Sequence, residues 1–174
     1  MNKKDLILKK IRIIPDFPKK GIGFLDICPL LADREAFGAV IELMADKAKD
    51  KGYTKIIGLE ARGFVFSAPL ALRLGCGFVM ARKAGKLPGE CVRGEYATEY
   101  SEAAIELQKG AVVPEDRVLI VDDIVATGGS LAAAEALVGT LCSNCDALCL
   151  IDIIDVPKLH RSEYEAIFEM KEAL

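Results

Sequence analysis

The segment Val118–Ser130, which reads VLIVDDIVATGGS, constrains the fold of this chain more than any other. An apolar run at Val118–Val121 ends in two adjacent carboxylates, Asp122 and Asp123. A Thr-Gly-Gly-Ser run at Thr127–Ser130 then opens an alanine-rich segment. This order predicts a buried strand, an acidic turn, a glycine loop and the start of a helix.

The same segment predicts a binding site with two different ends. A glycine-hydroxyl loop that opens a helix presents backbone N–H groups and the positive end of the helix dipole, which suits a phosphate. Asp122 and Asp123 repel each other and resist desolvation, so their place at the end of a buried strand indicates a use. Carboxylates suit neutral hydroxyls or a metal rather than more phosphate. Together the two ends fit a ribose 5-phosphate.

Other nucleotide-binding patterns are weaker here. Either aspartate could instead be a Walker-B-type magnesium ligand, but the sequence contains no G-x-x-x-x-G-K-[ST]. The G-x-G-x-x-G fingerprint of dinucleotide-binding folds is also missing from it. The sequence alone therefore favours phosphate binding without a P-loop.

Composition excludes several classes of protein. The 174 residues fit one domain, and 52% of them are hydrophobic, which is enough for a sizeable core. The net charge of −3 leaves no basic footprint for nucleic acid. No apolar run approaches the roughly 18–20 residues that span a bilayer, so we expect no membrane contact. The charged start of the chain lacks a signal-peptide core, and we expect a cytoplasmic protein.

The six cysteines offer an alternative chemistry. Cys142, Cys145 and Cys149, together with His160, could form a zinc site. However, Cys145–Ile151 has the pattern of a buried strand, in which cysteines serve as small apolar residues. The strand interpretation is favoured over zinc or redox chemistry.

Strands and helices alternate along the middle of the chain. This alternation predicts an α/β fold with a parallel sheet, whose ligands bind at the carboxyl ends of the strands. Three loops that follow strands carry the polar chemistry. The expected elements are helices at 5–11, 33–50, 64–74 and 131–141, strands at 55–59, 77–81, 103–108, 117–122 and 145–152, and a long exposed loop at Arg82–Arg93.

Val121–Ser130 resembles the phosphoribosyl diphosphate signature of the type I phosphoribosyltransferases. Further segments are similar to the adenine-specific members of that family, in the family's order. The similarity extends from about Ile11 to about Leu141. These segments are Ile14–Ile22 and Phe24–Leu31 in the N-terminal hood, Gly58–Phe64, Arg82–Pro88, and Glu99 with Tyr100.

The resemblance implies a fold and a reaction. The fold would be a single domain over 1–174, a type I phosphoribosyltransferase-like parallel sheet flanked by helices, with a hood at about 11–31 and a flexible loop at about 82–100. The reaction would belong to purine salvage, in which adenine and phosphoribosyl diphosphate give AMP and pyrophosphate. Mg²⁺ would arrive on the diphosphate substrate. The protein would be a homodimer, because the Arg-Lys part of the loop reaches the neighbouring subunit's site in this family.

The resemblance also implies roles for individual residues. Phe24 would stack on adenine while the backbone of Gly23 and Leu25 reads its edge, and Glu99 would handle the N7 proton of the purine. A non-proline cis peptide would follow Glu60 or Ala61. The aspartates would hold the ribose hydroxyls, the glycine loop the 5-phosphate and the cations the diphosphate. The predicted site, with no protein-bound metal, is Gly23, Phe24, Leu25, Arg62, Arg82, Lys83, Lys86, Glu99, Tyr100, Asp122, Asp123, Ala126, Thr127, Gly128, Gly129 and Ser130.

Two alternatives of different kinds stay open at this point. Gly23, Leu25 and Cys28 differ from the residues usual in the family's purine pocket, so a transferase for xanthine, hypoxanthine or guanine is one alternative. A non-catalytic purine-sensing regulator of the same fold is the other. Such a regulator would be free to lose the cations at Arg82, Lys83 and Lys86, which this chain keeps.

Overall fold

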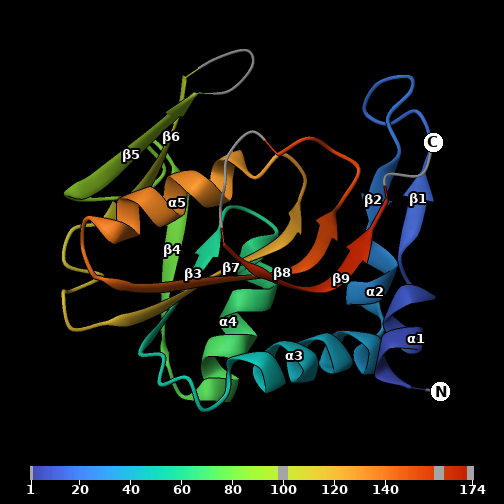
Figure 1. The fold of residues 1–174 in the computed structure, drawn as a ribbon, viewed down its shortest axis with the longest axis horizontal. Helices are drawn as coiled ribbons and strands as arrows, with labels where there is room; N and C mark the ends of the chain where they lie inside the picture. The colour runs from blue at the N-terminus through green and yellow to red at the C-terminus, as the bar shows by residue number, and fades with distance from the viewer. Residues whose placement is uncertain (1, 98–101, 159–162, 172–174) are drawn as a thin grey trace.

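The computed structural model describes residues 2–97, 102–158 and 163–171. Within them the chain forms a central sheet, a separate two-stranded hairpin and helices on both faces of the sheet (Figure 1). The helices are α1 Lys3–Leu8, α2 Cys28–Ala32, α3 Arg34–Ala48, α4 Gly63–Leu74 and α5 Gly129–Gly139. The strands are β1 Arg12–Ile14, β2 Phe24–Asp26, β3 Lys55–Leu59, β4 Gly77–Lys83, β5 Cys91–Ala97, β6 Glu102–Gln108, β7 Arg117–Val125, β8 Asn144–Ile153 and β9 Glu165–Met170.

The central sheet confirms the predicted α/β class. Its strand order within the described residues is β5-β6-β4-β3-β7-β8-β9, and β4, β3, β7, β8 and β9 run parallel. Helix α5 covers one face, while α3 and α4 lie on the other (Figure 1). The carboxyl ends of β3 and β7 are neighbours, so the loops that follow these strands meet at one edge.

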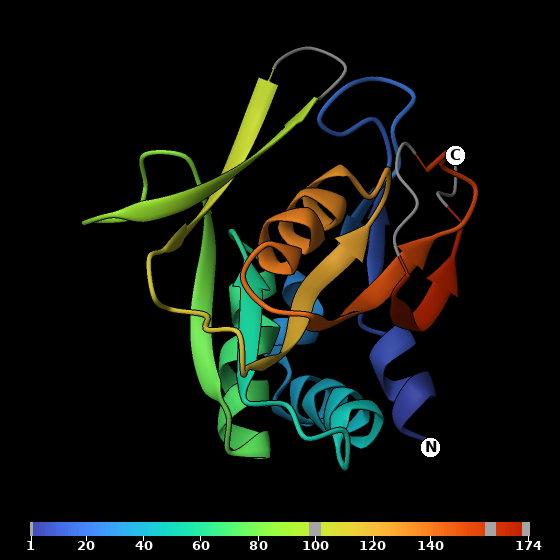
Figure 2. The same ribbon diagram turned by 60° about the vertical axis from the view of Figure 1, so that its left-hand side comes forward.

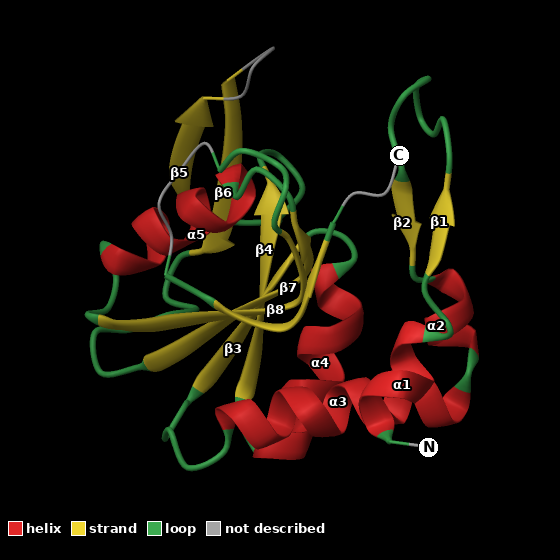
Figure 3. Ribbon diagram, turned by 45° about the vertical axis from the view of Figure 1, so that its right-hand side comes forward, coloured by secondary structure: helices red, strands yellow, loops and turns green. Residues whose placement is uncertain are grey.

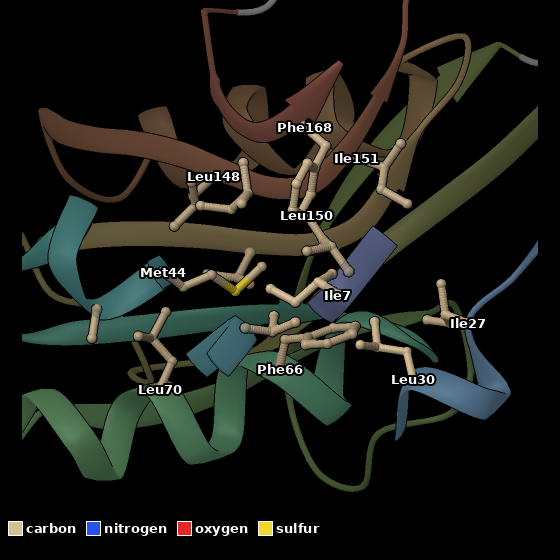
Figure 4. Packing of buried hydrophobic residues seen from close by; sticks show 14 of the residues in the cluster. Ile7, Ile27, Leu30, Met44, Phe66, Leu70, Leu148, Leu150, Ile151 and Phe168 are labelled. Atoms are coloured by element: carbon tan, nitrogen blue, oxygen red, sulfur yellow. The ribbon is translucent and has the colours of Figure 1, made fainter. Parts of the chain in front are cut away.

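Alternation along the strands divides the core into two layers. In β7, Leu119 and Val121 join the cluster beneath α3 and α4, while Val118 and Ile120 join the cluster beneath α5. Figure 4 shows the first cluster, where the Phe66 ring lies among side chains from the sheet and from helices far apart in sequence. This shared core ties the N-terminal segment to the body of the domain.

The N-terminal hood is a short antiparallel hairpin of β1 and β2, a pairing that the sequence did not predict (Figure 3). Arg12 pairs across it with Asp26, whose carboxylate accepts a hydrogen bond from Arg12 Nε at 3.2 Å. The backbone N–H of Cys28 donates to the same carboxylate. These hydrogen bonds, the Cys28 one first, lower the pKa of Asp26 to about 2. The hairpin places Phe24 at a defined position above the sheet edge.

The loop predicted at Arg82–Arg93 is confirmed only for residues 84–90, and both ends of that range belong to strands. β4 continues to Lys83, and β5 begins at Cys91 and pairs antiparallel with β6. The turn after β4 comprises residues 84–90, and its glycines Gly85 and Gly89 have positive φ angles. Cross-strand pairing satisfies backbone groups that a loop would expose. The β5–β6 arm extends beside α5 (Figure 2).

Most other expected elements are confirmed with shifted boundaries. The expected helix 5–11 is α1, which starts earlier because the Asn2 side chain accepts a hydrogen bond from Asp5 N at 2.8 Å. Asp33 caps α3 as predicted, since its side chain accepts from the backbone N–H groups of Glu35 and Ala36. β9 was not predicted. Within the described residues, no helix is both long and apolar enough to cross a membrane.

Candidate active site

The turn after β3 approaches the end of β7 so closely that only glycine fits there. A Cβ on Gly63 would lie 2.8 Å from the carbonyl oxygen of Val121 and 3.0 Å from Asp122 Oδ1. Gly58 and Val121 are register partners, so the two strands deliver their loops to the same place. The peptide bond between Glu60 and Ala61 is cis, one of the two positions predicted. The resulting turn carries Arg62 into the site.

The glycine loop forms a hollow of about 170 Å³ between the end of β7 and the start of α5. Gly128 lies in the left-handed region at φ +82°, directly before the first turn of α5. No side chain caps this helix, so its first N–H groups keep their capacity to bind an anion. The hollow is lined by Asp122, Ile124, Val125, Ala126, Thr127, Gly128, Gly129, Ser130 and Leu131.

The two aspartates face different surroundings, as successive residues of a strand do. Asp122 lines the hollow, and its Oδ1 accepts a hydrogen bond from the backbone N–H of Asp123 at 2.9 Å. Asp123 is buried, and its Oδ2 lies 2.7 Å from Nε of Arg62. Desolvation raises the pKa of both carboxyls, and the charge of Asp123 raises that of Asp122 further, while Arg62 opposes the shift of Asp123. The site holds two carboxyls that resist ionisation together.

Arg62 links the aspartates to the hood. Its guanidinium carbon lies 5.5 Å from the centre of the Phe24 ring, within the range of a cation–π contact. The Phe17 ring packs edge-on against Phe24 with centroids 5.1 Å apart. Leu25 is buried, with its side chain in the core and only its backbone left for recognition. Three predicted segments, the hood, the β3 turn and the β7 end, therefore meet here.

The predicted cation cluster is divided in the structure. Arg82 donates from Nε and Nη2 to both carboxylate oxygens of Glu60, at 3.2 and 3.0 Å, and from Nη1 to the carbonyl of Lys86 at 3.0 Å. The same carboxylate accepts from the backbone N–H of Lys83. Arg82, chiefly, holds the pKa of Glu60 below its usual value. Arg82 thus connects the turn after β3 to the turn after β4. The side chains of Lys83 and Lys86 are exposed.

Some residues of the site were missed by sequence reasoning, and others lie beyond the structure. Glu60 was taken only as part of a turn, although its position directly after a buried strand was a signal. Lys158, which contacts the glycine loop, stands in a polar stretch that gave no signal. Glu99 and Tyr100 lie outside the described residues, as does His160.

Comparisons with known proteins give one family. Residues 30–151 match the model of the phosphoribosyl transferase domain. A protein of Streptomyces clavuligerus named adenine phosphoribosyltransferase is 50% identical over 135 residues, which are 78% of this chain and 76% of that one.

Solved structures agree with the sequence comparisons. The crystal structure of adenine phosphoribosyltransferase from Thermoanaerobacter pseudethanolicus has a TM-score of 0.90 and 42% identity, covering 97% of this chain and 100% of that one. The Giardia lamblia enzyme complexed with 9-deazaadenine has a TM-score of 0.89 and 36% identity, covering 98% of both chains.

The raised pKa of Asp122 predicts that this carboxyl lowers the stability of the folded protein as the pH rises. Between the unfolded and folded pKa values the folded protein binds more protons than the unfolded chain, so the free energy of unfolding falls as pH rises through that window. Asp122→Asn cannot ionise and keeps the amide-accepting oxygen. We expect its melting temperature to exceed that of the wild type by a margin that grows as the pH rises from about 4, the usual pKa of an aspartate, towards the raised pKa of Asp122.

The measurement is thermal unfolding as a function of pH. Glu115→Gln removes a charge from an exposed turn and is the control, with an expected curve like that of the wild type. A melting temperature for Asp122→Asn below the wild-type value at neutral pH would contradict the desolvation argument.

Proposed function

The chain belongs to the phosphoribosyl transferase family, and we infer that it is an adenine phosphoribosyltransferase, a pentosyltransferase that makes AMP and pyrophosphate. The observation that carries this assignment is the meeting of Phe24, Arg62 and Asp123 beside the glycine loop. A ring for a base, a cation for a leaving group and an acid for a sugar then share one site. The named relatives favour adenine over a 6-oxopurine, and they favour an enzyme over a sensor.

The hollow at the start of α5 binds the 5-phosphate of the ribose. Backbone N–H groups of Thr127, Gly128 and Gly129 and the hydroxyls of Thr127 and Ser130 surround the phosphate, and the helix dipole adds a favourable field. Asp122 stands at the rim of the same hollow, where its carboxylate accepts from a ribose hydroxyl. The sugar is thereby held at both ends.

Arg62 changes partners when the substrate binds. Without substrate its guanidinium is the cation that faces the buried carboxylate of Asp123. The ribose hydroxyl takes over Asp123, and Arg62 turns to the diphosphate, whose charge grows as the bond to C1 breaks. Lys83 and Lys86 supply further positive charge from the turn after β4. Arg82 acts through Glu60, whose carboxylate also accepts a hydrogen bond from the backbone N–H of Lys83, directly before the turn after β4.

Mg²⁺ enters with the diphosphate substrate. No group of three or more His, Cys, Asp or Glu side chains in the described residues is arranged to hold a metal ion. The carboxylates of Asp122 and Asp123 are the hard oxygen donors nearest to the sugar, and they suit water-mediated contact with such an ion. The ion supplies neutralisation of the leaving diphosphate.

Adenine lies between the hood and the sheet edge. Its ring stacks on Phe24, and the backbone groups of Gly23 and Leu25 read its edge, which distinguishes a 6-amino from a 6-oxo purine by the direction of hydrogen bonds. Glu99 manages the N7 proton, with Tyr100 beside it. The reaction returns adenine to the nucleotide pool as purine salvage. We propose a cytoplasmic location, because the substrate and the product are phosphorylated.

An exposed apolar surface supports a homodimer. Leu72 on α4 is 85% exposed, and the exposed Val65 lies about two helical turns before it on the same face of the helix. Phe78 and Met80 project from β4 beside this helix, where the Phe78 ring contacts Phe64. Exposed apolar side chains on a helix and on the strand beside it are typical of an interface with another protein chain. Its closeness to the turn after β4 fits a partner whose site receives that turn.

The first prediction concerns turnover. Purified protein mixed with phosphoribosyl diphosphate and Mg²⁺ should form AMP when adenine is added, because the backbone of the hood matches a 6-amino purine. Nucleotide formation should be at least about a hundredfold slower with hypoxanthine, guanine or xanthine, since a reversed donor leaves site groups unpaired. The measurement is chromatography of the products. Absence of AMP would overturn the proposed function.

The second prediction concerns Asp123→Asn. The KM for phosphoribosyl diphosphate should rise about tenfold or more, because the amide loses a charge-assisted hydrogen bond to the ribose. The KM for adenine should change little. Glu115→Gln serves again as the exposed control. Equal KM values for phosphoribosyl diphosphate in Asp123→Asn and the wild type would remove Asp123 from the ribose site.

The third prediction concerns assembly. The wild type should sediment at twice the 18.8 kDa of one chain, and Phe78→Asp should sediment as a single chain because it buries a charge in the interface. Ile154→Asp, at an exposed apolar residue on the opposite side of the sheet, is the matched control and should stay dimeric. A wild type that sediments as one chain would contradict the proposed interface.

A further inference from the structure

Lys158, which follows Ala126 by 32 residues, forms hydrogen bonds with the beginning of the glycine loop. Nζ of Lys158 donates to the carbonyl oxygens of Ala126 at 2.6 Å and Ile153 at 2.8 Å. It also donates to Oδ1 of Asp152 at 2.6 Å, while the carbonyl of Val125 lies further away at 3.3 Å. An ammonium group has three donors, so the three short contacts use all of them.

These contacts begin where the strand ladder ends. β7 and β8 are paired as far as Val125 and Asp152, and the loop beyond has no ladder partner. Lys158 joins the carbonyl that follows the last pair on β7 to the carbonyl that follows it on β8. It therefore continues the connection between the two strands by one more residue, at the point where the chain turns into the hollow.

The direction of the Ala126 carbonyl matters for an anion in the hollow. A carbonyl oxygen that faced the phosphate would repel it, and the peptide that carries this oxygen also carries the N–H of Thr127. With the oxygen held by Lys158, that N–H points the opposite way, since the two groups of a trans peptide are antiparallel. The lysine thus sets the orientation of the first peptide of the loop.

The lysine is itself held in place. Tyr164 donates its hydroxyl to the same Asp152 oxygen at 2.9 Å. Burial, and then this hydrogen bond, raises the pKa of Tyr164, which keeps the hydroxyl as a donor. The side chains of Lys158 and Asp152 are 29% and 18% exposed, so water competes for them less than for a surface pair.

We propose that Lys158 is a positioning residue for 5-phosphate binding, which acts by fixing the Ala126 carbonyl and does not touch the phosphate. The inference rests on the proposed function, in which this loop holds the 5-phosphate of phosphoribosyl diphosphate. Asp152 and Tyr164 serve as the support of the lysine.

The test uses Lys158→Met and two measurements. The dissociation constant for ribose 5-phosphate, measured by titration calorimetry, should rise about tenfold, as for loss of a hydrogen bond made by a charged group. The KM for phosphoribosyl diphosphate should rise by a similar factor while the KM for adenine stays constant. Lys109→Met removes an equal charge from an exposed pair with Glu90 and should change neither quantity.

Several outcomes would overturn the proposal. They are an unchanged affinity of Lys158→Met for ribose 5-phosphate, and an equal rise in both KM values, which would indicate general damage to the fold. The calorimetric arm does not depend on turnover. A wild type that binds ribose 5-phosphate but makes no AMP would therefore refute the proposed function. The role of Lys158 in phosphate binding would then still be decided by the calorimetric comparison of Lys158→Met with the wild type.

Asp152→Asn separates positioning from simple charge. Loss of this carboxylate makes the surroundings of the loop more positive, so long-range attraction alone would tighten ribose 5-phosphate binding. If Asp152 supports Lys158, binding should weaken instead, by about threefold, because the neutral amide holds the ammonium less strongly. Tighter binding in Asp152→Asn would overturn the proposal.

Discussion

The structure depends on two adjacent carboxylates near the end of β7, of which that of Asp123 is buried and that of Asp122 half-buried. Neither carboxyl is solvated well, and desolvation raises the pKa of both. The domain keeps them in place because the turn after β3 approaches within contact distance at Gly63 and brings Arg62 to Asp123. The close pairing of β3 with β7 in a parallel sheet makes this approach possible. The proposed site for a sugar phosphate thus contains two desolvated carboxyls that lower the stability of the folded protein.

Three cations at or beside the site have an acid partner among the described residues. Arg62 faces Asp123, Arg82 holds Glu60, and Lys158 holds Asp152. The three pairs differ in what a substrate would do to them. In the proposed function a ribose hydroxyl would compete for Asp123, so the first pair would open on binding, while the other two pairs fix backbone at the edges of the site and would remain closed. Binding of a sugar with three phosphoryl groups would then involve one exchange of partners and two pairs that stay in place.

Sequence reasoning predicted what local pattern determines. The run from Val118 to Ser130 correctly predicted a strand, a glycine loop and the start of a helix, and Asp33 and Gly75 marked helix ends correctly. The acidic turn was wrong, because β7 continues through Asp122 and Asp123 to Val125. It failed where partners are distant. Cys91–Ala97 looked like loop because its pairing with β6 is set by register rather than by apolar content. The hydrogen bond from Lys158 to Ala126 joins residues 32 positions apart, so no local sequence pattern indicates it.

The unusual residues of the purine pocket become understandable from the hood. Successive strand residues point to opposite sides, so Phe24 faces the site while Leu25 enters the core at 3% exposure. A long polar side chain at position 25 is then unnecessary, since the backbone remains available to read the base. Cys28 stands beside Asp26, which Arg12 ties to β1, so the cysteine adds no charge to the pocket. The Asp26 carboxylate raises the pKa of the Cys28 thiol, first through a hydrogen bond and then through its charge. If the backbone of this hairpin reads the base, as we propose, then a hairpin held at Arg12 and Asp26 would tolerate both changes and keep the preference for a 6-amino purine.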